Sequence, residues 1–269
     1  MFNLLHTFHP QPIALMIGGF TIRWYGVFMA LGALLGILAA AKLAERYKIT
    51  KDEIYNLAFY LIIFGLLGAR LYYVLYGWQY YISHPLDIFK IWQGGLAIYG
   101  AIIGGAVTVY YFAKKEGIDF WRTIDVLVIG LLIGQILGRL GNYFNQELFG
   151  KPTDLPWGIP IDSINRPTGF STESYFHPTF LYEILLNLLL LGGLLLIHKI
   201  NISRGKRLQS GTIALSYLMG YSLIRFFTET LRTDSTPFIF GVRWQMMASI
   251  ILLILAVGML IFRIIKKRK

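Results

Sequence analysis

Seven apolar segments determine what this chain can fold into, because each is long enough to cross the hydrocarbon core of a bilayer. Lipid offers no water to backbone N–H and C=O groups, so a spanning segment must satisfy them internally, as a helix does. The sequence therefore predicts an all-α integral membrane protein with seven transmembrane helices. The predicted spans are Trp24–Lys42, Ile54–Tyr76, Gly95–Ala113, Thr123–Leu140, Pro178–Ile197, Thr212–Glu229 and Trp244–Phe262.

The composition supports a membrane protein. Hydrophobic residues make up 56% of the chain and charged residues 14%, whereas soluble globular proteins are about one quarter charged. The net charge of +11 is concentrated after the first, third, fifth and seventh predicted spans. By the positive-inside rule, the amino terminus lies outside and the carboxyl terminus is cytoplasmic. Basic residues in short juxtamembrane loops suit anionic lipids, so we expect membrane lipids as partners and no nucleic acid.

Several residue types and motifs are missing from the sequence, and their absence excludes certain kinds of catalytic and metal-binding site. The chain contains no cysteine, which excludes disulfide bonds, thiolate zinc sites and a cysteine nucleophile. It also lacks an HExxH motif, a G-x-S-x-G elbow and a Walker loop, so we expect no metal and no cofactor. No cleavable signal peptide is predicted, because the first basic residue is Arg23 and prolines interrupt the apolar start. Residues 1–23 are expected to form a short external or interfacial segment.

We interpret residues 1–269 as a single polytopic membrane domain, with a small extracytoplasmic cap at 141–177 between spans four and five. Proline and glycine are frequent in this segment, which favours a small fold of strands and turns. A loop of this length in a compact protein is usually functional, so we expect the chemistry near the outer leaflet. The prolines are Pro152, Pro156, Pro160 and Pro167.

Glycines recur every fourth residue in several spans, so one face of each of these helices forms a ridge without side chains. Such small-residue faces let membrane helices approach closely, and helix packing is a better interpretation than ligand contact. The chain shows no internal repeat, which weakens a transporter built from duplicated halves. The ridges are Gly130, Gly134 and Gly138 in the fourth span, Gly100 and Gly104 in the third, and Gly32 and Gly36 in the first.

A polar cluster closes the fourth span, where Arg139, Asn142 and Asn145 follow an apolar run. Ionisable side chains at membrane depth are costly and usually mark a functional site that faces a protected cavity. Asparagine amides both donate and accept hydrogen bonds, and the planar arginine fork suits phosphate or carboxylate. The cluster is therefore predicted to hold a polar head group.

In the sixth span, Arg225 and Glu229 are four residues apart and share one helix face. An intrahelical ion pair is at least as plausible as a catalytic role. Together with Arg139, however, Arg225 could clamp one phosphate, and packing alone does not require two such costly residues. Arg70, deep in the second span, is interpreted as a structural bridge to Asp125 or Glu183, with lining of the cavity as the alternative.

Ten consecutive residues, Gly138-Arg139-Leu140-Gly141-Asn142-Tyr143-Phe144-Asn145-Gln146-Glu147, resemble the signature of the prolipoprotein diacylglyceryl transferases. The resemblance covers nearly the whole chain, from Arg23 to about Gln245, and the seven-span topology of the family agrees with the charge distribution. Shorter matches occur in order at Arg23-Trp24-Tyr25-Gly26, Gly68-Ala69-Arg70, His177-Pro178 with Leu181-Tyr182-Glu183, and Arg225-Phe226 with Glu229.

The resemblance implies a membrane enzyme of the bacterial cytoplasmic membrane. Its reaction would transfer the diacylglyceryl group of phosphatidylglycerol to the lipobox cysteine thiol of a prolipoprotein signal peptide. The product would be a thioether, with glycerol-1-phosphate as the leaving group. Two other classes stay open: a lipid transporter or flippase, and a non-catalytic factor that only binds lipoprotein precursors during export.

A mechanistic hypothesis assigns roles to individual residues. Arg139, Asn142 and Asn145 are expected to hold the phosphate and glycerol of phosphatidylglycerol. Arg225 is expected to stabilise the charge that develops on the departing phosphate, usually the largest catalytic effect. The phosphatidylglycerol-binding set is completed by Tyr25, Glu229 and Gly150.

The proton acceptor is left open between Tyr99, Glu147 and the leaving phosphate. Tyr99 stands where the family often has a histidine. A tyrosine with its ordinary pKa of about 10 is a poor base near neutral pH. Tyr99 would act as a base only if a nearby arginine lowered its pKa, and it would otherwise orient a group.

Overall fold

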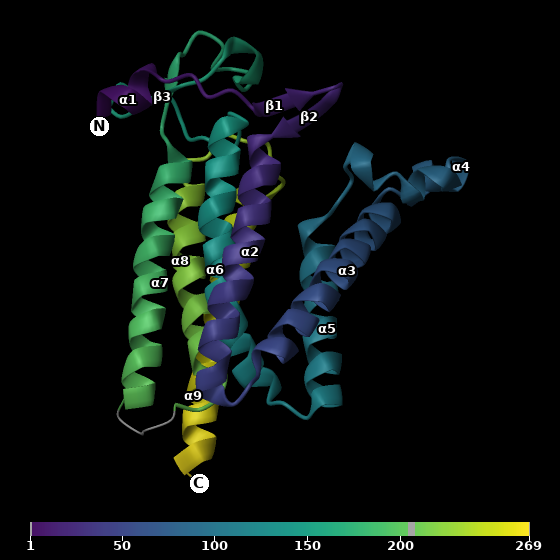
Figure 1. The fold of residues 1–269 in the computed structure, drawn as a ribbon. Helices are drawn as coiled ribbons and strands as arrows, with labels where there is room; N and C mark the ends of the chain where they lie inside the picture. The colour runs from purple at the N-terminus through teal and green to yellow at the C-terminus, as the bar shows by residue number, and fades with distance from the viewer. Residues whose placement is uncertain (1, 204–207, 269) are drawn as a thin grey trace. The chain divides into compact units, whose positions relative to one another are not determined.

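The computed structural model describes residues 2–203 and 208–268, which are mostly helical (Figure 1). Each predicted span forms a helix, so the predicted element types are confirmed. Several helices extend beyond the predicted windows. The long helices are α2 (Trp24–Ala44), α3 (Lys51–Tyr76), α5 (Ile98–Glu116), α6 (Phe120–Phe144), α7 (Thr179–Ser203), α8 (Thr212–Glu229) and α9 (Trp244–Arg268).

The remaining elements are short, and the strands form antiparallel pairs β1–β2, β3–β4 and β5–β6. The strands are β1 (Ile13–Ile17), β2 (Phe20–Arg23), β3 (Ile159–Pro160), β4 (Tyr175–Phe176), β5 (Phe238–Ile239) and β6 (Val242–Arg243). The short helices are α1 (Phe2–Thr7), α4 (Trp78–Ser83), η1 (Glu45–Tyr47), η2 (Pro85–Phe89), η3 (Ile91–Gln93) and η4 (Ser163–Asn165).

Within the described residues, five helices are long and apolar enough to cross a membrane. They are α2 (extended by η1), α3, α6, α7 and α9. The other two long helices, α5 and α8, have 19 and 18 residues. Since α8 also carries Arg225 and Glu229, it is both short and partly charged. The count of seven spans therefore stays a prediction.

The chain divides into two compact units. The smaller unit, Ile37–Leu127, contains α3 and α5. Helix α3 begins with a capping box, in which Thr50 and Glu53 each satisfy a backbone N–H of the other. The predicted glycine contact of α5 is confirmed, because a Cβ atom at Gly68 of α3 would lie only 2.5 Å from the carbonyl oxygen of Gly100.

Arg70 has a structural role in this smaller unit, but its predicted partners are wrong. Its guanidinium donates to the backbone carbonyls of Asp87, Ile88, Gly94 and Gly95 instead of pairing with Asp125 or Glu183. Because an arginine offers several donors in a fixed plane, one buried side chain holds the connection between α4 and α5. Asp125 pairs with Arg122 at 3.6 Å.

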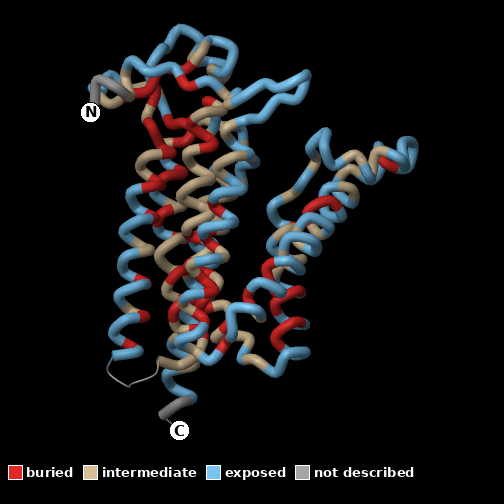
Figure 2. Tube along the Cα trace, in the orientation of Figure 1, coloured by how far each residue is buried: buried red, intermediate tan, exposed pale blue. Residues whose placement is uncertain are grey.

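The larger unit, Met1–Gly36 with Val128–Lys269, contains the start of α2, most of α6, and α7, α8 and α9. Helix α8 packs against both α7 and α9. Figure 2 shows buried residues on the inward faces of these helices and at the ends that meet the 145–178 segment. A Cβ atom at Gly36 would lie 2.6 Å from the carbonyl oxygen of Gly130, so the glycine ridges of α2 and α6 serve helix packing, as predicted.

Residues 145–178 form the expected small fold of turns and short strands. Its apolar core contains Phe149, Ile159, Ile161 and Phe176, and it packs against Tyr143 at the end of α6. Helix α6 continues through Phe144, so the first residues of the predicted cap are helical. The extracytoplasmic location of this segment stays a prediction.

The amino-terminal segment lies against this small fold through α1 and continues as the β1–β2 hairpin. The His6 ring stacks on Tyr175 with ring centroids 3.9 Å apart, and its Nδ1 lies 3.0 Å from the Gly158 carbonyl oxygen. The hairpin presents apolar side chains outward, and Phe20 at its tip is 80% exposed. Exposed apolar side chains of this kind fit the predicted interfacial character of residues 1–23.

Candidate active site

Three helices meet at the carboxylate of Glu183. Arg139 on α6 lies 2.6 Å from Glu183 Oε2, and Arg225 on α8 lies 3.2 Å from Glu183 Oε1. Glu183 itself is on α7 and is 1% exposed. The structure therefore brings together the two arginines predicted as a phosphate clamp, and it does so through a carboxylate that neutralises part of their charge.

Glu229 forms a second buried carboxylate beside the first. Its Oε2 accepts a hydrogen bond from Arg225 at 2.7 Å, which confirms the predicted pair within α8. Its Oε1 accepts from Arg243 at 2.9 Å, and the side chain is fully buried. Glu229 thus joins α8 to β6, and a buried carboxylate with two arginine partners is held in one orientation.

Two further arginines extend this network of ion pairs. Arg232 donates to Asp234 at 2.7 Å, and its Nη1 lies 3.7 Å from Glu183 Oε1. Arg243 also approaches Asp234, at 3.4 Å. The resulting network alternates basic and acidic groups: Arg139, Arg225, Arg232 and Arg243 with Glu183, Glu229 and Asp234.

A chain of hydrogen bonds connects Arg139 to Glu147 through the signature. Arg139 Nη1 donates to Asn142 Oδ1 at 3.1 Å, and Asn142 Nδ2 donates to Glu147 Oε1 at 2.7 Å. Asn145 Nδ2 approaches the same carboxylate oxygen at 3.4 Å. The signature residues therefore act as one connected group, and Glu147 at its end is exposed.

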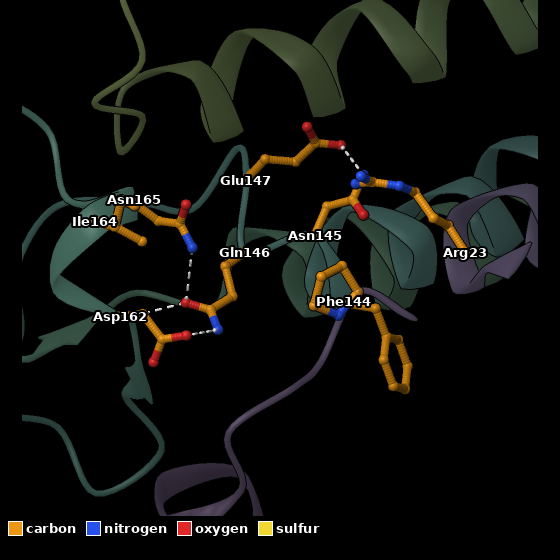
Figure 3. A pocket seen from close by; sticks show the side chains of 9 residues that line it. Arg23, Phe144, Asn145, Gln146, Glu147, Asp162, Ile164 and Asn165 are labelled. Carbon is orange, nitrogen blue, oxygen red and sulfur yellow. Dashed lines mark hydrogen bonds between the residues drawn. The ribbon is translucent and has the colours of Figure 1, made fainter. Parts of the chain in front are cut away.

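The turn after α6 is fixed by Gln146. Its backbone is left-handed, with φ 51°, an uncommon conformation for a residue other than glycine. Its buried amide donates to Asp162 at 2.7 Å and accepts from the Asp162 backbone N–H (Figure 3). It also donates to the Pro10 carbonyl at 3.1 Å. These bonds hold the turn and thereby set the direction of Glu147.

The other residues predicted to bind the lipid lie around this group. Tyr25 of α2 packs on Gly141, where an added Cβ atom would lie 2.7 Å from the tyrosine ring and 3.1 Å from its Cα. Gly150 joins three loops: its N–H donates to the His177 carbonyl at 2.9 Å, and it pairs with Arg232 in a β-bridge. The contacts of Gly150 are packing and backbone contacts, and its lipid-binding role stays a prediction.

His177 lies at the junction of the 145–178 segment with α7. Its Nδ1 is 3.1 Å from the Tyr182 hydroxyl. Burial, followed by the positive charge of Lys151, lowers the pKa of His177 below its usual value. The ring is therefore favoured in its neutral form.

Tyr99 belongs to the smaller unit, Ile37–Leu127, whereas the network described above belongs to the larger one. It is the second residue of α5, its side chain is half exposed, and its ring lies 6.1 Å from that of Tyr72. Its contribution to the site stays a prediction.

Sequence reasoning missed several members of the network. The sequence predicts Glu183 only as a possible partner of Arg70, although it lies in a segment that resembles the family. Arg232, Arg243 and Asp234 were not singled out, because they lie in a short connection with no repeated spacing. Their charge near the end of a span is the signal that could have found them.

The chain is similar to known proteins over most of its length. The model of the prolipoprotein diacylglyceryl transferase family matches residues 12–262. A phosphatidylglycerol–prolipoprotein diacylglyceryl transferase of Synechococcus elongatus is 46% identical over 84% of this chain and 78% of its own length. Proteins of the same name from Synechocystis sp. and Trichormus variabilis are 42% and 43% identical over 84% of this chain and 80% of their own lengths. This chain belongs to the prolipoprotein diacylglyceryl transferase family.

Proposed function

We propose that this chain transfers the diacylglyceryl group of phosphatidylglycerol to the thiol of a prolipoprotein cysteine. The transfer forms a thioether and releases glycerol-1-phosphate. Family membership and the names of the relatives support the activity, and apolar helices supply the membrane setting that a lipid substrate requires. The chain contains no cysteine, so the thiol comes from the substrate.

The observation that carries the mechanism is the convergence of Arg139 and Arg225 on Glu183. Each guanidinium uses part of its N–H donors on carboxylate or amide oxygens of the protein. Because a guanidinium has further donors in the same plane, both can also bind one phosphate group. Glu183 then keeps the two arginines at a fixed spacing, so little reorganisation is needed as charge develops.

The reaction needs a thiolate, since the thiolate and not the thiol is the nucleophile. The sulfur attacks the glyceryl carbon, the carbon–oxygen bond to phosphate breaks, and the electron pair leaves with the phosphate oxygen. Arg139 and Arg225 stabilise that charge. The thiol proton goes to Glu147, to Tyr99 or to the departing phosphate. Glu147 is supported as the acceptor by its exposure and by its hydrogen-bonded connection to Arg139.

We further propose that α5 and α8 also cross the membrane, which gives seven spans. Arg225 and Glu229 are tolerated in α8 because each is paired within the ion-pair network. The positive charge after the first, third, fifth and seventh helices then places the carboxyl terminus in the bacterial cytoplasm. The signature and the 145–178 segment lie on the outer side, where exported precursors are found.

The test is a transfer assay with purified protein, labelled phosphatidylglycerol and a lipobox peptide. Mass spectrometry detects thioether-linked diacylglycerol on the peptide. Arg139→Ala and Arg225→Ala should each abolish transfer, whereas Arg46→Ala, which removes an exposed charge outside the site, should not. Near-normal transfer by either site variant would contradict the two-arginine mechanism.

The same assay separates the alternatives. Movement of lipid between leaflets without bond formation indicates a transporter or flippase. Peptide binding without either process indicates a non-catalytic export factor.

A further inference from the structure

A cavity of about 430 Å³ opens beside the signature, between segments that are far apart in the sequence (Figure 3). Its walls come from Pro12 and Arg23 at the base of the β1–β2 hairpin, from the end of α6 and the turn after it, and from residues 162–165. The lining residues lie in loops, in the short helix η4, or at the ends of β2 and α6. The cavity therefore belongs to the loop end of the larger unit.

The cavity has an unusual mixture of polar groups. Arg23 lines it, and its side chain extends toward Asn145 and Glu147 (Figure 3). Glu147 lines it as well, and its Oε1 accepts a hydrogen bond from Asn142 and is approached by the Asn145 amide. Phe144 and Ile164 supply apolar wall, and Ile164 is 88% exposed. Opposite charges beside apolar surface suit a ligand that both donates and accepts hydrogen bonds.

The cavity is also held in shape before any ligand arrives. Gln146 bonds to Asp162 in both directions, and the Asn165 amide approaches Gln146 Oε1 at 3.3 Å. These bonds join two walls of the cavity to each other. A preformed site loses less conformational entropy on binding than a mobile one.

We propose that this cavity binds the residues that directly follow the lipobox cysteine of the precursor, an inference that rests on the proposed function. The lipid phosphate is assigned to Arg139 and Arg225, which do not line the cavity, although Asn145 lines it and is shared with the predicted lipid site. A peptide unit carries one donor and one acceptor, and the cavity offers the donors of Arg23 and the carboxylate of Glu147 to them. A peptide seated here also places its cysteine beside Glu147, at the end of the hydrogen-bonded chain from Arg139.

The size of the cavity predicts a preference for small side chains. It is at the low end of the volumes typical of ligand sites, and its walls are fixed by the bonds of Gln146. A short run of small residues therefore fits, whereas a bulky residue directly after the cysteine does not.

The experiment measures binding of fluorescent lipobox peptides to the purified protein in phosphatidylglycerol nanodiscs. The peptides end at the cysteine or extend one, two or three residues beyond it. For the unchanged protein, Kd should fall about tenfold along this series, as expected for one or two net hydrogen bonds. Ile164→Trp, an exposed position that narrows the cavity, should remove the dependence on length. Arg23→Gln should weaken binding of the long peptides only.

Lys151→Gln serves as the matched control, because it removes an exposed charge from the same segment but does not line the cavity. A length series with no change in Kd for the unchanged protein would overturn the inference. So would an effect of Ile164→Trp on the KM for phosphatidylglycerol with peptide binding unchanged, since the cavity would then serve the lipid. Length-dependent binding without any transfer would support the cavity assignment and reject the proposed activity.

Discussion

Arg139 Nη2 and Glu183 Oε2 lie 2.6 Å apart and join α6 to α7, and Arg225 of α8 contacts the same carboxylate. Neither side chain is free to take another position without leaving a buried charge unpaired. The cost of an unpaired buried charge is far larger than that of a surface ion pair. The spacing of the two proposed phosphate-binding arginines therefore depends on a residue that need not touch the substrate.

Replacing Glu183 with glutamine keeps the shape of the side chain but removes the charge that Arg139 and Arg225 share. We expect a loss of about 3–5 kcal/mol in stability, the usual cost of breaking a buried ion pair. Transfer should fall by at least about 100-fold, comparable to the loss of one stabilising group in a transition state. Thermal unfolding in detergent and the transfer assay measure the two effects.

Glu173→Gln, at an exposed position, is the matched control and should change neither quantity. Glu183→Asp should recover part of the stability, because it restores the charge with a shorter reach. A Glu183→Gln protein that is as stable and as active as the unchanged one would contradict the positioning role.

Gly141→Ala should disturb the site more than the fold. The new methyl group would lie 2.7 Å from the Tyr25 ring and 3.1 Å from its Cα, so the start of α2 must move away from α6. We expect the KM for phosphatidylglycerol to rise about tenfold, if Tyr25 helps to bind the lipid, with a stability loss of about 1–3 kcal/mol. Kinetics at varied lipid concentration give the first value.

Gly138→Ala is the control for this substitution, because its nearest neighbour would be Met29 Sδ at 3.6 Å, an ordinary contact. It should leave KM unchanged. Equal KM values for the two variants would show that the approach of Tyr25 to Gly141 is unimportant for lipid binding.

Gly130→Ala should destabilise the contact between α2 and α6. Its Cβ atom would lie 2.6 Å from the backbone carbonyl oxygen of Gly36, and a helix backbone cannot yield as a flexible side chain can. We expect a loss of about 2 kcal/mol, within the range for overpacking. Gly134→Ala, which would meet nothing within 4 Å, should be neutral or slightly stabilising because alanine favours the helix. Thermal unfolding of the two variants should rank them in this order.

Stability should depend on pH through His177. Its folded-state pKa is lowered, chiefly by burial and then by Lys151, so the unfolded chain binds a proton more readily than the folded protein. The contribution of His177 is fully present above the unfolded-state pKa of about 6.5 and is lost as the pH falls through the lower folded-state pKa. His177→Gln should therefore show a smaller drop in melting temperature between pH 7 and pH 5 than the unchanged protein. An identical drop would assign the dependence to other groups.

The sequence was sufficient to predict the long helices, because an apolar run in lipid must satisfy its own backbone. The predicted helix ends were too early in some cases. Helix α6 continues through Phe144, past the predicted end at Leu140, because Arg139 and Asn142 have partners that compensate for their polarity. The glycine contacts were also predictable, because a small-residue ridge has a fixed period. The pairing of Gly36 with Gly130 follows that pattern.

The partners of charged residues were less predictable. Arg70 donates to backbone carbonyls, and a carbonyl carries no signal in the side-chain sequence. Glu183 is a shared partner of Arg139 and Arg225 because α6, α7 and α8 meet, and no spacing within one helix encodes that junction. The role of Tyr99 depends on contacts that the sequence does not determine.

The bond from Gln146 to the Pro10 carbonyl has a practical consequence for work with this protein. It tethers the signature turn to a segment more than a hundred residues earlier, and α1 adds the contact of His6 with Gly158. Deletion of the first dozen residues, or a bulky fusion ahead of them, should therefore loosen Glu147 although no signature residue is altered. Affinity tags for purification are better placed after α9.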